Sequence, residues 1–298
     1  MKTYICIDIG GTMIKYGLVD ERGQILQQMK RPTEAHLGGP GILQKVEEIV
    51  DTFLASHAIT GLALSSAGMV DPVKGEIFYS GPQIPNYAGT QFKEILEGKY
   101  HLPCEIENDV NCAGLAEVMD GAAKDSQVTL CLTIGTGIGG CILIGKEIFH
   151  GYSNSACEVG YMHMEGQEFQ QLGATTELVR KVAERKGDAL SEWDGYRIFE
   201  AAKAGDDLCV TAINEMIDVL ATGIANICYV INPQMVVLGG GIMGQEEYLG
   251  QPMNEALKAK LVPSLAEKTT IAFAKHQNNA GLLGAFYHFI LKHPVKEE

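Results

Sequence analysis

The chain has 298 residues, of which 46% are hydrophobic and 20% are charged. This composition is typical of a folded globular protein with a large core, and it excludes extensive disorder. The 23 Lys and Arg residues are outnumbered by 37 Asp and Glu residues, which gives a net charge of −14. Because a nucleic-acid-binding surface is usually basic, this balance argues against nucleic acid as a partner. An anion site would need backbone N–H groups, a metal ion or a few placed cations.

The first residues, MKTYICIDIGGT, do not have the pattern of a secretion signal, because their apolar stretch is short and Asp8 interrupts it. No apolar run approaches the roughly 18 residues of a membrane span. The eight cysteines include no CxxC pair, and several stand inside apolar runs. This usage is typical of buried free thiols in a reducing compartment. We therefore expect a cytoplasmic protein that does not act at a membrane.

Apolar runs and helical periodicity alternate along the chain, which predicts an α/β fold. Two strands enter glycine turns and continue into β-like sequence, and each predicts a hairpin: ICIDIGGT (5–12) and LCLTIGTGIGG (130–140). Further strands are predicted at 61–66, 235–241 and 270–274, and helices at 42–56, 111–119, 210–231 and 282–292. No linker rich in Pro, Ser or Gly divides the chain, so we expect a domain boundary at a crossing point near 105–125.

Glycine is unusually frequent, with 35 residues of 298, where roughly 7% is usual. The first glycine motif runs from Asp8 to Lys15 and reads DIGGTMIK. This motif favours the binding of a nucleotide phosphate with a divalent metal. Its two glycines let the backbone approach the phosphate, and Thr12 adds a hydroxyl. The Asp8 carboxylate, at the end of the strand, can reach Mg²⁺ directly or through water. The alternative is an ordinary Gly-Gly hairpin turn.

The second glycine motif, GTGIGG, spans Gly135 to Gly140. It is not a Walker loop, because no Gly-Lys-Ser/Thr follows, and it fits a dinucleotide fingerprint poorly, because a strand follows it. A second phosphate-binding hairpin explains it better. The alternative is again a glycine-rich turn, but two such loops in one chain make coincidence a weaker explanation.

Between the two loops lies the segment ENDVNCAG, which spans Glu107 to Gly114. Asn108 and Asp109 stand where an extended segment gives way to a helix, and a helix N-terminus favours an ionised carboxylate. By itself Asp109 would be interpreted as a plain N-cap. Beside two phosphate loops we favour a catalytic base, because a kinase that acts on a hydroxyl needs a proton acceptor near that oxygen.

The motifs DIGGTMIK, ENDVNCAGLAE, GTGIGG and VINPQMVVLGGG together resemble the ROK family (repressors, open reading frames, kinases) of the actin-like ATPase and hexokinase clan. The resemblance runs from Ile5 to the last helix and keeps the order and spacing of the motifs. It implies two actin-like (ribonuclease H-like) α/β domains with mixed sheets flanked by helices and an active-site cleft between them. It assigns 1–109, with the helix of 282–298 packing back on it, to the smaller domain and 110–281 to the larger, and it implies a homodimer.

The resemblance also implies roles for single residues. Asp109 matches the general base, and the Mg²⁺ position falls to Asp8. The implied contacts to ATP are Asp8, Gly10, Gly11, Thr12, Lys15, Gly135, Thr136, Gly137, Gly139, Gly240 and Gly241. The implied contacts to the sugar are Gly68, Asn86, Asn108, Asp109, Glu158, Tyr161 and Gln170.

This chain departs from the family pattern in the segment 158–180. Tyr161 stands where the family commonly has a histidine that binds zinc, and the segment has none of the cysteines that complete that zinc site. Since a structural zinc needs four such ligands, we predict no zinc, with His163 as a residue that binds no metal. The position of a second sugar-binding carboxylate falls to Gln170, or to Glu168 if the gap is placed differently.

Members without zinc resemble glucokinases, N-acetylmannosamine kinases and bacterial β-glucoside kinases. The expected activity is therefore ATP-dependent phosphorylation of the 6-hydroxyl of a hexose or hexoside, with a β-glucoside or glucose favoured. N-acetylmannosamine kinase is the alternative. A sugar-responsive repressor is disfavoured by the acidic charge and by the early start of the first motif, which leaves no room before it for a DNA-binding domain. A sugar-binding protein without catalysis is disfavoured because Asp8, Asp109 and both loops are intact.

Overall fold

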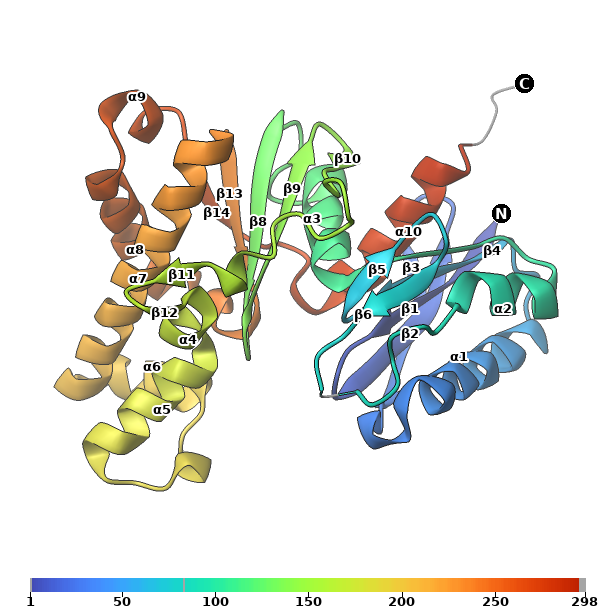
Figure 1. The fold of residues 1–298 in the computed structure, drawn as a ribbon, viewed down its shortest axis with the longest axis horizontal. Helices are drawn as coiled ribbons and strands as arrows, with labels where there is room; N and C mark the ends of the chain where they lie inside the picture. The colour runs from blue at the N-terminus through green and yellow to red at the C-terminus, as the bar shows by residue number, and fades with distance from the viewer. Residues whose placement is uncertain (1, 83, 295–298) are drawn as a thin grey trace. The chain divides into compact units, whose positions relative to one another are not determined.

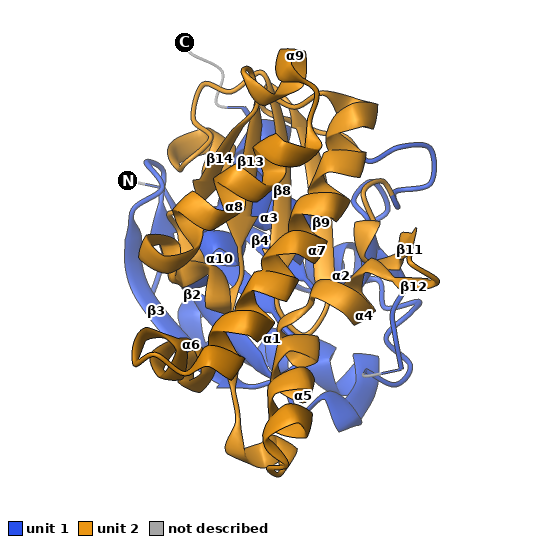
Figure 2. Ribbon diagram, turned by 90° about the vertical axis from the view of Figure 1, so that its left-hand side faces the viewer, with its two compact units in different colours: residues 1–116, 150–155, 278–298 blue, residues 117–149, 156–277 orange. Residues whose placement is uncertain are grey.

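In the computed structural model, residues 2–82 and 84–294 are described, and the chain forms two compact α/β units (Figures 1 and 2). Unit 1 comprises residues 1–116, 150–155 and 278–298, and unit 2 comprises 117–149 and 156–277. Each unit has one five-stranded mixed sheet with helices packed on it. The predicted α/β class with mixed, helix-flanked sheets is confirmed. The predicted domain limits of 1–109 and 110–281 stay a prediction.

The sheet of unit 1 has the order β3-β2-β1-β4-β7, in which β1, β2 and β3 pair antiparallel while β1, β4 and β7 pair parallel. Its strands are β1 Thr3–Ile9, β2 Met13–Asp20, β3 Ile25–Pro32, β4 Gly61–Ser66 and β7 Cys104–Asn108. A small hairpin, β5 Met69–Asp71 and β6 Glu76–Tyr79, follows β4. The helices are η1 Ala35–Leu37, α1 Gly38–Leu54, α2 Phe92–Tyr100, α3 Asp109–Asp120 and α10 Ala280–Lys292. The last residues of α3, from Glu117 on, belong to unit 2.

Both faces of this sheet are buried, which explains why β1 is apolar at almost every position. Ile5 and Ile7 pack with residues of α1 and α2 in one cluster. Tyr4 and Cys6, which alternate with them, pack with α10 and with Cys112 of α3 in another. Because side chains alternate between the faces of a strand, a strand covered on both faces loses the polar alternation of a half-buried one.

The sheet of unit 2 has the order β10-β9-β8-β13-β14 and repeats the pairing of the first: two antiparallel pairs, then two parallel pairs. Its strands are β8 Val128–Ile134, β9 Ile138–Ile144, β10 Glu147–Ile148, β13 Met235–Gly239 and β14 Thr270–Phe273, and a short hairpin is formed by β11 His163–Met164 and β12 Gln167–Glu168. Its α-helices are α4 Phe169–Gly173, α5 Thr175–Lys186, α6 Gly195–Lys203, α7 Asp207–Ile231, α8 Glu246–Lys260 and α9 Pro263–Ala266. Short 3₁₀ turns are η2 Val159–Tyr161, η3 Leu190–Glu192, η4 Gly241–Gly244 and η5 Gln277–Asn279, the last of which ends in unit 1.

Helix α7 lies in the core of unit 2. Within the described residues it is the one helix long and apolar enough to cross a membrane by length and composition, but 56% of its most apolar window is buried inside the protein. Its buried side chains, such as Ile213, Leu220 and Ile224, belong to the main apolar cluster of the unit. We therefore assign it as a core helix, which explains why it is apolar nearly all round.

Candidate functional site

The first glycine motif forms the turn between β1 and β2, as the sequence predicts. Gly10 donates its N–H to the carbonyl of Met13 (3.1 Å), which closes the turn. Thr33, just after β3, holds the turn from behind: its hydroxyl donates to the Gly10 carbonyl (2.7 Å) and its N–H donates to the Thr12 carbonyl (2.9 Å). Gly11 and Thr12 are exposed, and a Cβ on Gly11 would meet nothing within 4 Å. The turn is therefore fixed at its base and open where a phosphate would approach.

Asp8 lies at the end of β1, largely buried below this turn. Its Oδ1 accepts a hydrogen bond from the Ser65 hydroxyl (2.8 Å), and its Oδ2 lies 3.9 Å from Lys15 Nζ. Burial raises the pKa of Asp8, and the Ser65 hydrogen bond and the Lys15 charge oppose that rise. Lys15 also donates to the Asn278 carbonyl (3.2 Å), so its charge is used within unit 1. Helix α10 approaches closely, because a Cβ on Gly281 would lie 2.4 Å from Asp8 Oδ1.

A single carboxylate of this kind fits Mg²⁺. That ion prefers oxygen ligands, keeps several waters and is usually held by one or two carboxylates together with the phosphates of its substrate. Asp8 supplies the carboxylate, and the exposed Thr12 hydroxyl stands in the same turn. Within residues 2–82 and 84–294, no group of three or more His, Cys, Asp and Glu side chains could hold a metal alone. A magnesium site would then need the phosphates of a nucleotide to be complete.

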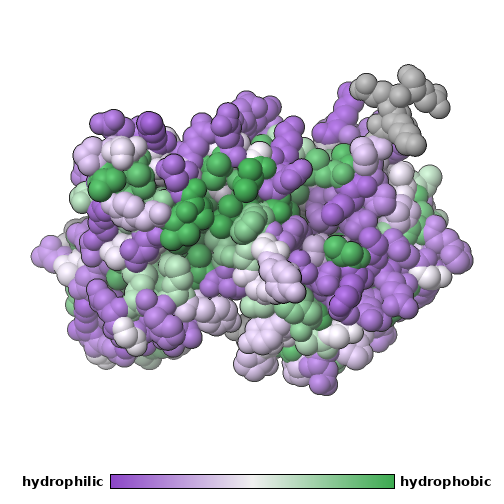
Figure 3. All heavy atoms as spheres, turned by 45° about the horizontal axis from the view of Figure 1, so that its top comes forward, coloured by the Kyte–Doolittle hydropathy of each residue, from purple (hydrophilic) through white to green (hydrophobic). Residues whose placement is uncertain are grey.

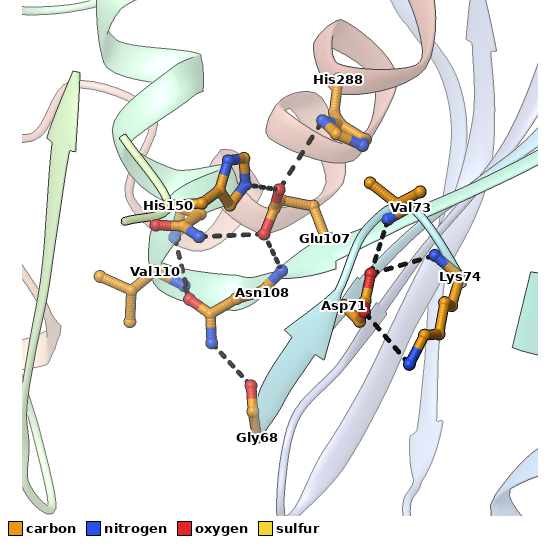
Figure 4. A network of polar contacts seen from close by, with 10 residues as sticks. Gly68, Asp71, Val73, Lys74, Glu107, Asn108, Val110, His150 and His288 are labelled. Carbon is orange, nitrogen blue, oxygen red and sulfur yellow. Dashed lines mark hydrogen bonds and ion pairs between the residues drawn. The ribbon is translucent and has the colours of Figure 1, made fainter. Parts of the chain in front are cut away.

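Asn108 caps the helix that begins at Asp109. Its Oδ1 accepts hydrogen bonds from the N–H groups of Val110 (2.9 Å) and Asn111 (3.0 Å), and its Nδ2 donates to the Gly68 carbonyl (2.9 Å) (Figure 4). The same Nδ2 also donates to Asp109 Oδ1 (3.1 Å). The plain N-cap interpretation of Asp109 therefore fails, because the neighbouring amide performs the capping. Asp109 is the first residue of α3, where the helix dipole favours its ionised form.

Two loops of unit 1 surround this junction. Gly68 has φ 91°, and a Cβ there would lie 2.9 Å from a backbone carbonyl oxygen, so the turn requires glycine. Asn86 adopts a left-handed conformation (φ 51°), and the adjacent Tyr87 is buried with its hydroxyl 2.6 Å from the Ser66 hydroxyl. Burial raises the pKa of Tyr87, and the negative charge of Asp109 raises it further. Unit 1 thus brings the predicted residues Gly68, Asn108 and Asp109 together, and Tyr87, which follows the predicted Asn86, lies close enough for the charge of Asp109 to raise its pKa.

The second glycine motif forms the β8–β9 turn in unit 2, which confirms the second predicted hairpin. Gly135 donates its N–H to the Gly137 carbonyl (2.9 Å). Two threonines at the start of α5 hold the turn: the Thr175 N–H donates to the Gly135 carbonyl (2.9 Å), and the Thr176 hydroxyl donates to the Thr136 carbonyl (2.9 Å). No side chain caps this end of α5. A helix N-terminus beside a glycine turn favours an anion.

A cavity of about 1050 Å³ lies beside this turn in unit 2. A nucleoside fits such a volume, since ligand pockets usually measure roughly 300–1000 Å³. Its lining includes the predicted residues Gly135, Thr136 and Gly241, together with Thr175, Thr176, Val179, Leu190, Ser191, Trp193, Asp194, Gly195, Tyr196, Phe199, Ile242 and Gln245. The predicted Gly240 has φ 105°, and a Cβ there would lie 2.1 Å from the Ile134 carbonyl oxygen.

Our sequence reasoning missed most of this lining. A usable signal was present, because TT at 175–176 directly precedes a charged helical run and thereby marks a helix start. Trp193 directly precedes α6 and Tyr196 lies in its first turn, and this helix was not predicted from the sequence. Only the fold brings them to the glycine turn.

The predicted sugar contacts of unit 2 lie around the second turn. Burial raises the pKa of Glu158, which precedes η2, while Tyr161 at the end of η2 is 48% exposed. Gln170 Oε1 would lie 2.8 Å from a Cβ on Gly137 and 3.1 Å from one on Gly160, so this side chain fills the space between the turn and η2. Its Nε2 donates to Glu168 Oε2 (2.8 Å), and the Glu168 carboxylate also caps α4.

Comparison with known proteins gives a consistent result. A model of the ROK family matches residues 4–291. The β-glucoside kinase of Listeria monocytogenes is 37% identical over 292 residues, with 95% of this chain and 96% of that protein covered. Among solved structures, a ROK family protein from Streptococcus pneumoniae in complex with sucrose is 32% identical, with a TM-score of 0.86 and coverage of 98% and 99%. A ROK family glucokinase from Streptomyces griseus in complex with glucose and AMPPNP is 26% identical, with a TM-score of 0.83 and coverage of 95% and 97%. The chain therefore belongs to the ROK family, in its sugar-kinase branch, as its motifs predict.

Proposed function

We propose that this kinase transfers the γ-phosphoryl group of ATP to the 6-hydroxyl of a hexose or hexoside, with β-glucosides and glucose as the favoured acceptors. The observation that carries the proposal is the β7–α3 junction, where Asn108 takes over helix capping and Asp109 begins the helix as a carboxylate. The identity of 37% to a β-glucoside kinase supports the choice of acceptor.

In the proposed reaction, Asp109 orients the sugar 6-hydroxyl and accepts its proton. The hydroxyl oxygen forms a bond to the γ-phosphorus while the bond from that phosphorus to the bridging oxygen of ADP breaks. Asp8 would hold Mg²⁺ directly or through water, and the bound ion would supply positive charge at the β- and γ-phosphates. The backbone N–H groups of the two glycine turns offset further negative charge without basic side chains.

The nucleotide contacts follow from each unit in turn. In unit 1, Gly10, Gly11 and Thr12 face the phosphates and Lys15 supports Asp8. In unit 2, phosphate binds at the N-terminus of α5 and at the turn with Gly135, Thr136, Gly137 and Gly139. The cavity lined by Gly241, which follows Gly240 in the chain, takes adenosine. The aromatic rings of Trp193 and Tyr196 line that cavity and suit a planar base. The AMPPNP bound by the Streptomyces relative, an ATP analogue, supports this choice of donor.

The sugar contacts proposed are Gly68, Asn86, Asn108 and Asp109 in unit 1 and Glu158, Tyr161 and Gln170 in unit 2. We favour Gln170 over Glu168 for the last position, because the Glu168 carboxylate is already used in capping α4. We also propose that the site holds no zinc. Metal analysis of the purified protein tests this, and tightly held zinc at one atom per chain would contradict it.

Three further proposals come with the family. The enzyme is cytoplasmic, it forms a homodimer, and its two lobes, 1–109 and 110–281, close over the sugar. Closure driven by the acceptor would exclude water and suppress wasteful ATP hydrolysis. Light scattering after size-exclusion chromatography tests the dimer, since a monomer would elute with the mass of one 32.2 kDa chain.

The decisive experiment is an ADP-release assay with glucose, cellobiose, N-acetylmannosamine and fructose, compared by kcat/KM. We expect the highest value with cellobiose or glucose. A highest value with N-acetylmannosamine would instead establish the alternative kinase. ADP release that no sugar on the panel stimulates, by a protein that still binds sugar, would contradict the kinase proposal and favour a non-catalytic sugar-binding protein.

A further inference from the structure

Glu107, the residue before Asn108, is a fully buried carboxylate with a complete set of hydrogen-bond partners. Its side chain is 0% exposed. Its Oε1 accepts from the Asn108 N–H (2.7 Å) and from Asn111 Nδ2 (2.9 Å), and its Oε2 accepts from His150 Nε2 (2.6 Å). Figure 4 shows these contacts converging on one carboxylate at the end of β7. Thus Oε1 of Glu107 holds the β7–α3 junction through Asn108 and Asn111, and Oε2 binds His150, which is distant in the sequence.

His150 reaches Glu107 from a separate part of the chain. It is the first residue of His150–Ser155, a six-residue segment that belongs to unit 1, whereas the chain on either side of it belongs to unit 2. Its side chain is 23% exposed. The segment is thus tied to the β7–α3 junction by a charge-assisted hydrogen bond at its first residue. Such bonds are short and are stronger than those between neutral groups.

The charge on Glu107 depends on its partners. Burial alone would raise the pKa of Glu107, but hydrogen bonds from His150 and Asn111 and the charges of His150 and His288 lower it below its usual value. His288, on α10, faces the same oxygen with its Nδ1 3.9 Å away. Burial lowers the pKa of His288, and the negative charge of Glu107 opposes that shift. Of the two histidines, His150 is the one that forms a hydrogen bond with the Glu107 carboxylate.

The contacts form a chain that ends at the proposed base. His150 orients Glu107, Glu107 accepts the Asn108 N–H, and the Asn108 side chain contacts both the Gly68 carbonyl and Asp109 Oδ1. We propose that His150 is a positioning residue for the phosphoryl transfer: through the Glu107 carboxylate it fixes the strand end from which Asn108 and Asp109 project. The inference rests on the proposed role of Asp109 and adds a positioning role for His150, which lies 41 positions later in the chain.

A merely structural ion pair is the competing explanation, and the same strand provides a control for it. Glu105, two residues earlier on β7, accepts a hydrogen bond from His293 Nε2 (2.8 Å) and pairs with Lys93 (2.9 Å). This second His–Glu pair has the same chemistry on the same strand. None of the contacts described for Glu105 reaches Asn108 or Asp109. Loss of His293 should therefore report on stability alone.

The test compares His150→Gln with His150→Asn, using the full chain, ATP and the best sugar from the panel. Glutamine can place an amide N–H near the position of the imidazole Nε2, whereas asparagine is one methylene shorter and cannot reach Glu107. Both variants are polar and neutral, and the site is partly exposed, so both should fold. His293→Asn is the control. The measurements are kcat and KM for each substrate, with the melting temperature and circular dichroism spectrum of each variant.

We expect His150→Asn to lower kcat at saturating sugar by about 10- to 100-fold, the size of effect that a small misplacement of reacting groups produces. His150→Gln should recover most of that loss, and KM for ATP should stay within about twofold of wild type. His293→Asn should lower the melting temperature about as much as His150→Asn does, and it should leave kcat unchanged.

The proposal is overturned if kcat of folded His150→Asn stays within about threefold of wild type, or if His150→Gln and His150→Asn lower kcat equally. It is also overturned if His293→Asn lowers kcat as much as His150→Asn does. A wild-type protein without sugar-stimulated ADP release would contradict the proposed function itself, so the two failures are distinguishable.

Discussion

Asn108 and Asp109 are adjacent polar residues with separate tasks, and the side-chain contacts distinguish them. The Asn108 amide oxygen caps α3, and its nitrogen donates to the Gly68 carbonyl and to Asp109 Oδ1. Either residue type makes a good N-cap, so the sequence alone could not decide between them. The first glycine turn shows a similar division, because Thr33 holds its carbonyls from behind while Gly11 and Thr12 remain exposed.

Replacing Asp109 with asparagine should lower kcat by at least about 100-fold, because general-base catalysis usually contributes roughly 10²- to 10⁴-fold. The loss of a charge from the first turn of α3 should cost stability only about 0.3–1 kcal/mol. Steady-state kinetics and thermal melts check both values. Asp120→Asn, at the other end of the same helix, is the control and should keep full activity. A variant of Asp109 with a tenth or more of the wild-type kcat would show that another group takes the proton.

Replacing Thr33 with valine removes one hydroxyl of nearly the same shape. The lost hydrogen bond to the Gly10 carbonyl should cost about 0.5–1.5 kcal/mol of stability. It should also raise KM for ATP several-fold, since the phosphate turn loses a support. Thr269→Val is a matched control, because that hydroxyl also donates to a carbonyl, of Pro233 at 3.0 Å, in a buried site away from both turns. Equal effects of the two variants on KM would contradict the supporting role of Thr33.

At the scale of elements, sequence patterns located the two glycine hairpins and the helices α1, α3, α7 and α10, but placed the ends of these helices less well. The helix predicted for 111–119 spans Asp109–Asp120, and the one predicted for 210–231 spans Asp207–Ile231. The missing first residues follow the capping side chains of Asn108 and Asp206, and apolar periodicity does not detect caps. The predicted strand at 235–241 ends at Gly239, because Gly240 turns the chain with a positive φ. Helices α2, α4, α5, α6, α8 and α9 were not predicted from the sequence. For α4 and α9 the reason is their length, since four or five residues carry too little periodicity.

Helix α10 packs so closely on α3 that one glycine is needed at the contact. A Cβ on Gly284 would lie 1.9 Å from the Cys112 carbonyl oxygen, and a backbone atom cannot rotate away. Gly284→Ala should therefore destabilise the protein by about 1–3 kcal/mol or more. Gly98→Ala, in the exposed part of α2 where a Cβ would meet nothing within 4 Å, should instead stabilise it by about 0.4–1 kcal/mol. Urea denaturation measures both. A free energy of unfolding that Gly284→Ala leaves unchanged would mean that α10 can shift away from α3.

The start of core helix α7 provides a pH-dependent contribution to stability. Asp206 accepts hydrogen bonds from the N–H groups of Leu208 and Cys209 and pairs with Lys186 (2.6 Å). These contacts, led by the one with Lys186, lower the pKa of Asp206 to about 2. Because the folded-state pKa lies below the unfolded value near 3.9, the ionised side chain stabilises the fold above about pH 4, and this contribution is lost as the pH falls from about 4 to about 2.

Asp206→Asn keeps the capping oxygen and removes the charge. Its melting temperature should lie below that of wild type at neutral pH, and the gap should narrow as the pH falls below about 4. Asp207→Asn, at the next position in the chain, is the control. Its melting temperature at neutral pH should differ less from that of wild type. A gap that stays constant down to about pH 3 would show that the Asp206 charge contributes nothing.

At the scale of the whole molecule, the two sheets share one pattern of pairing, and the sequence shows this only as two glycine hairpins. The parallel partners β4, β7, β13 and β14 come from distant parts of the chain, so short-range patterns cannot assign their neighbours. The same limit applied to the site. The motifs identified the glycine turns and the Asn108–Asp109 junction, whereas the aromatic lining of the cavity, Thr33 and His150 became visible only through contacts across many residues.

The charge of the molecule also makes a prediction about how it binds ATP. Figure 3 shows many hydrophilic side chains around a continuous apolar area on the face that it draws, and the net charge is −14. Among the proposed phosphate contacts Lys15 is the one cation, and its Nζ already lies 3.9 Å from Asp8. The remaining contacts are backbone N–H groups, which act at short range. Long-range attraction between the protein and ATP is therefore not expected.

Raising KCl from about 0.05 M to about 0.5 M, which shortens the screening length from roughly 14 Å to roughly 4 Å, should leave KM for Mg-ATP within about twofold or lower it, because the salt screens repulsion between two anions. A site built on a cluster of Lys and Arg would respond in the opposite direction. The KM of the uncharged sugar, measured in the same titration at constant Mg²⁺, serves as the control for general salt effects. A tenfold or larger rise in KM for ATP, with the sugar KM unchanged, would show that basic side chains outside the two glycine turns bind the phosphates.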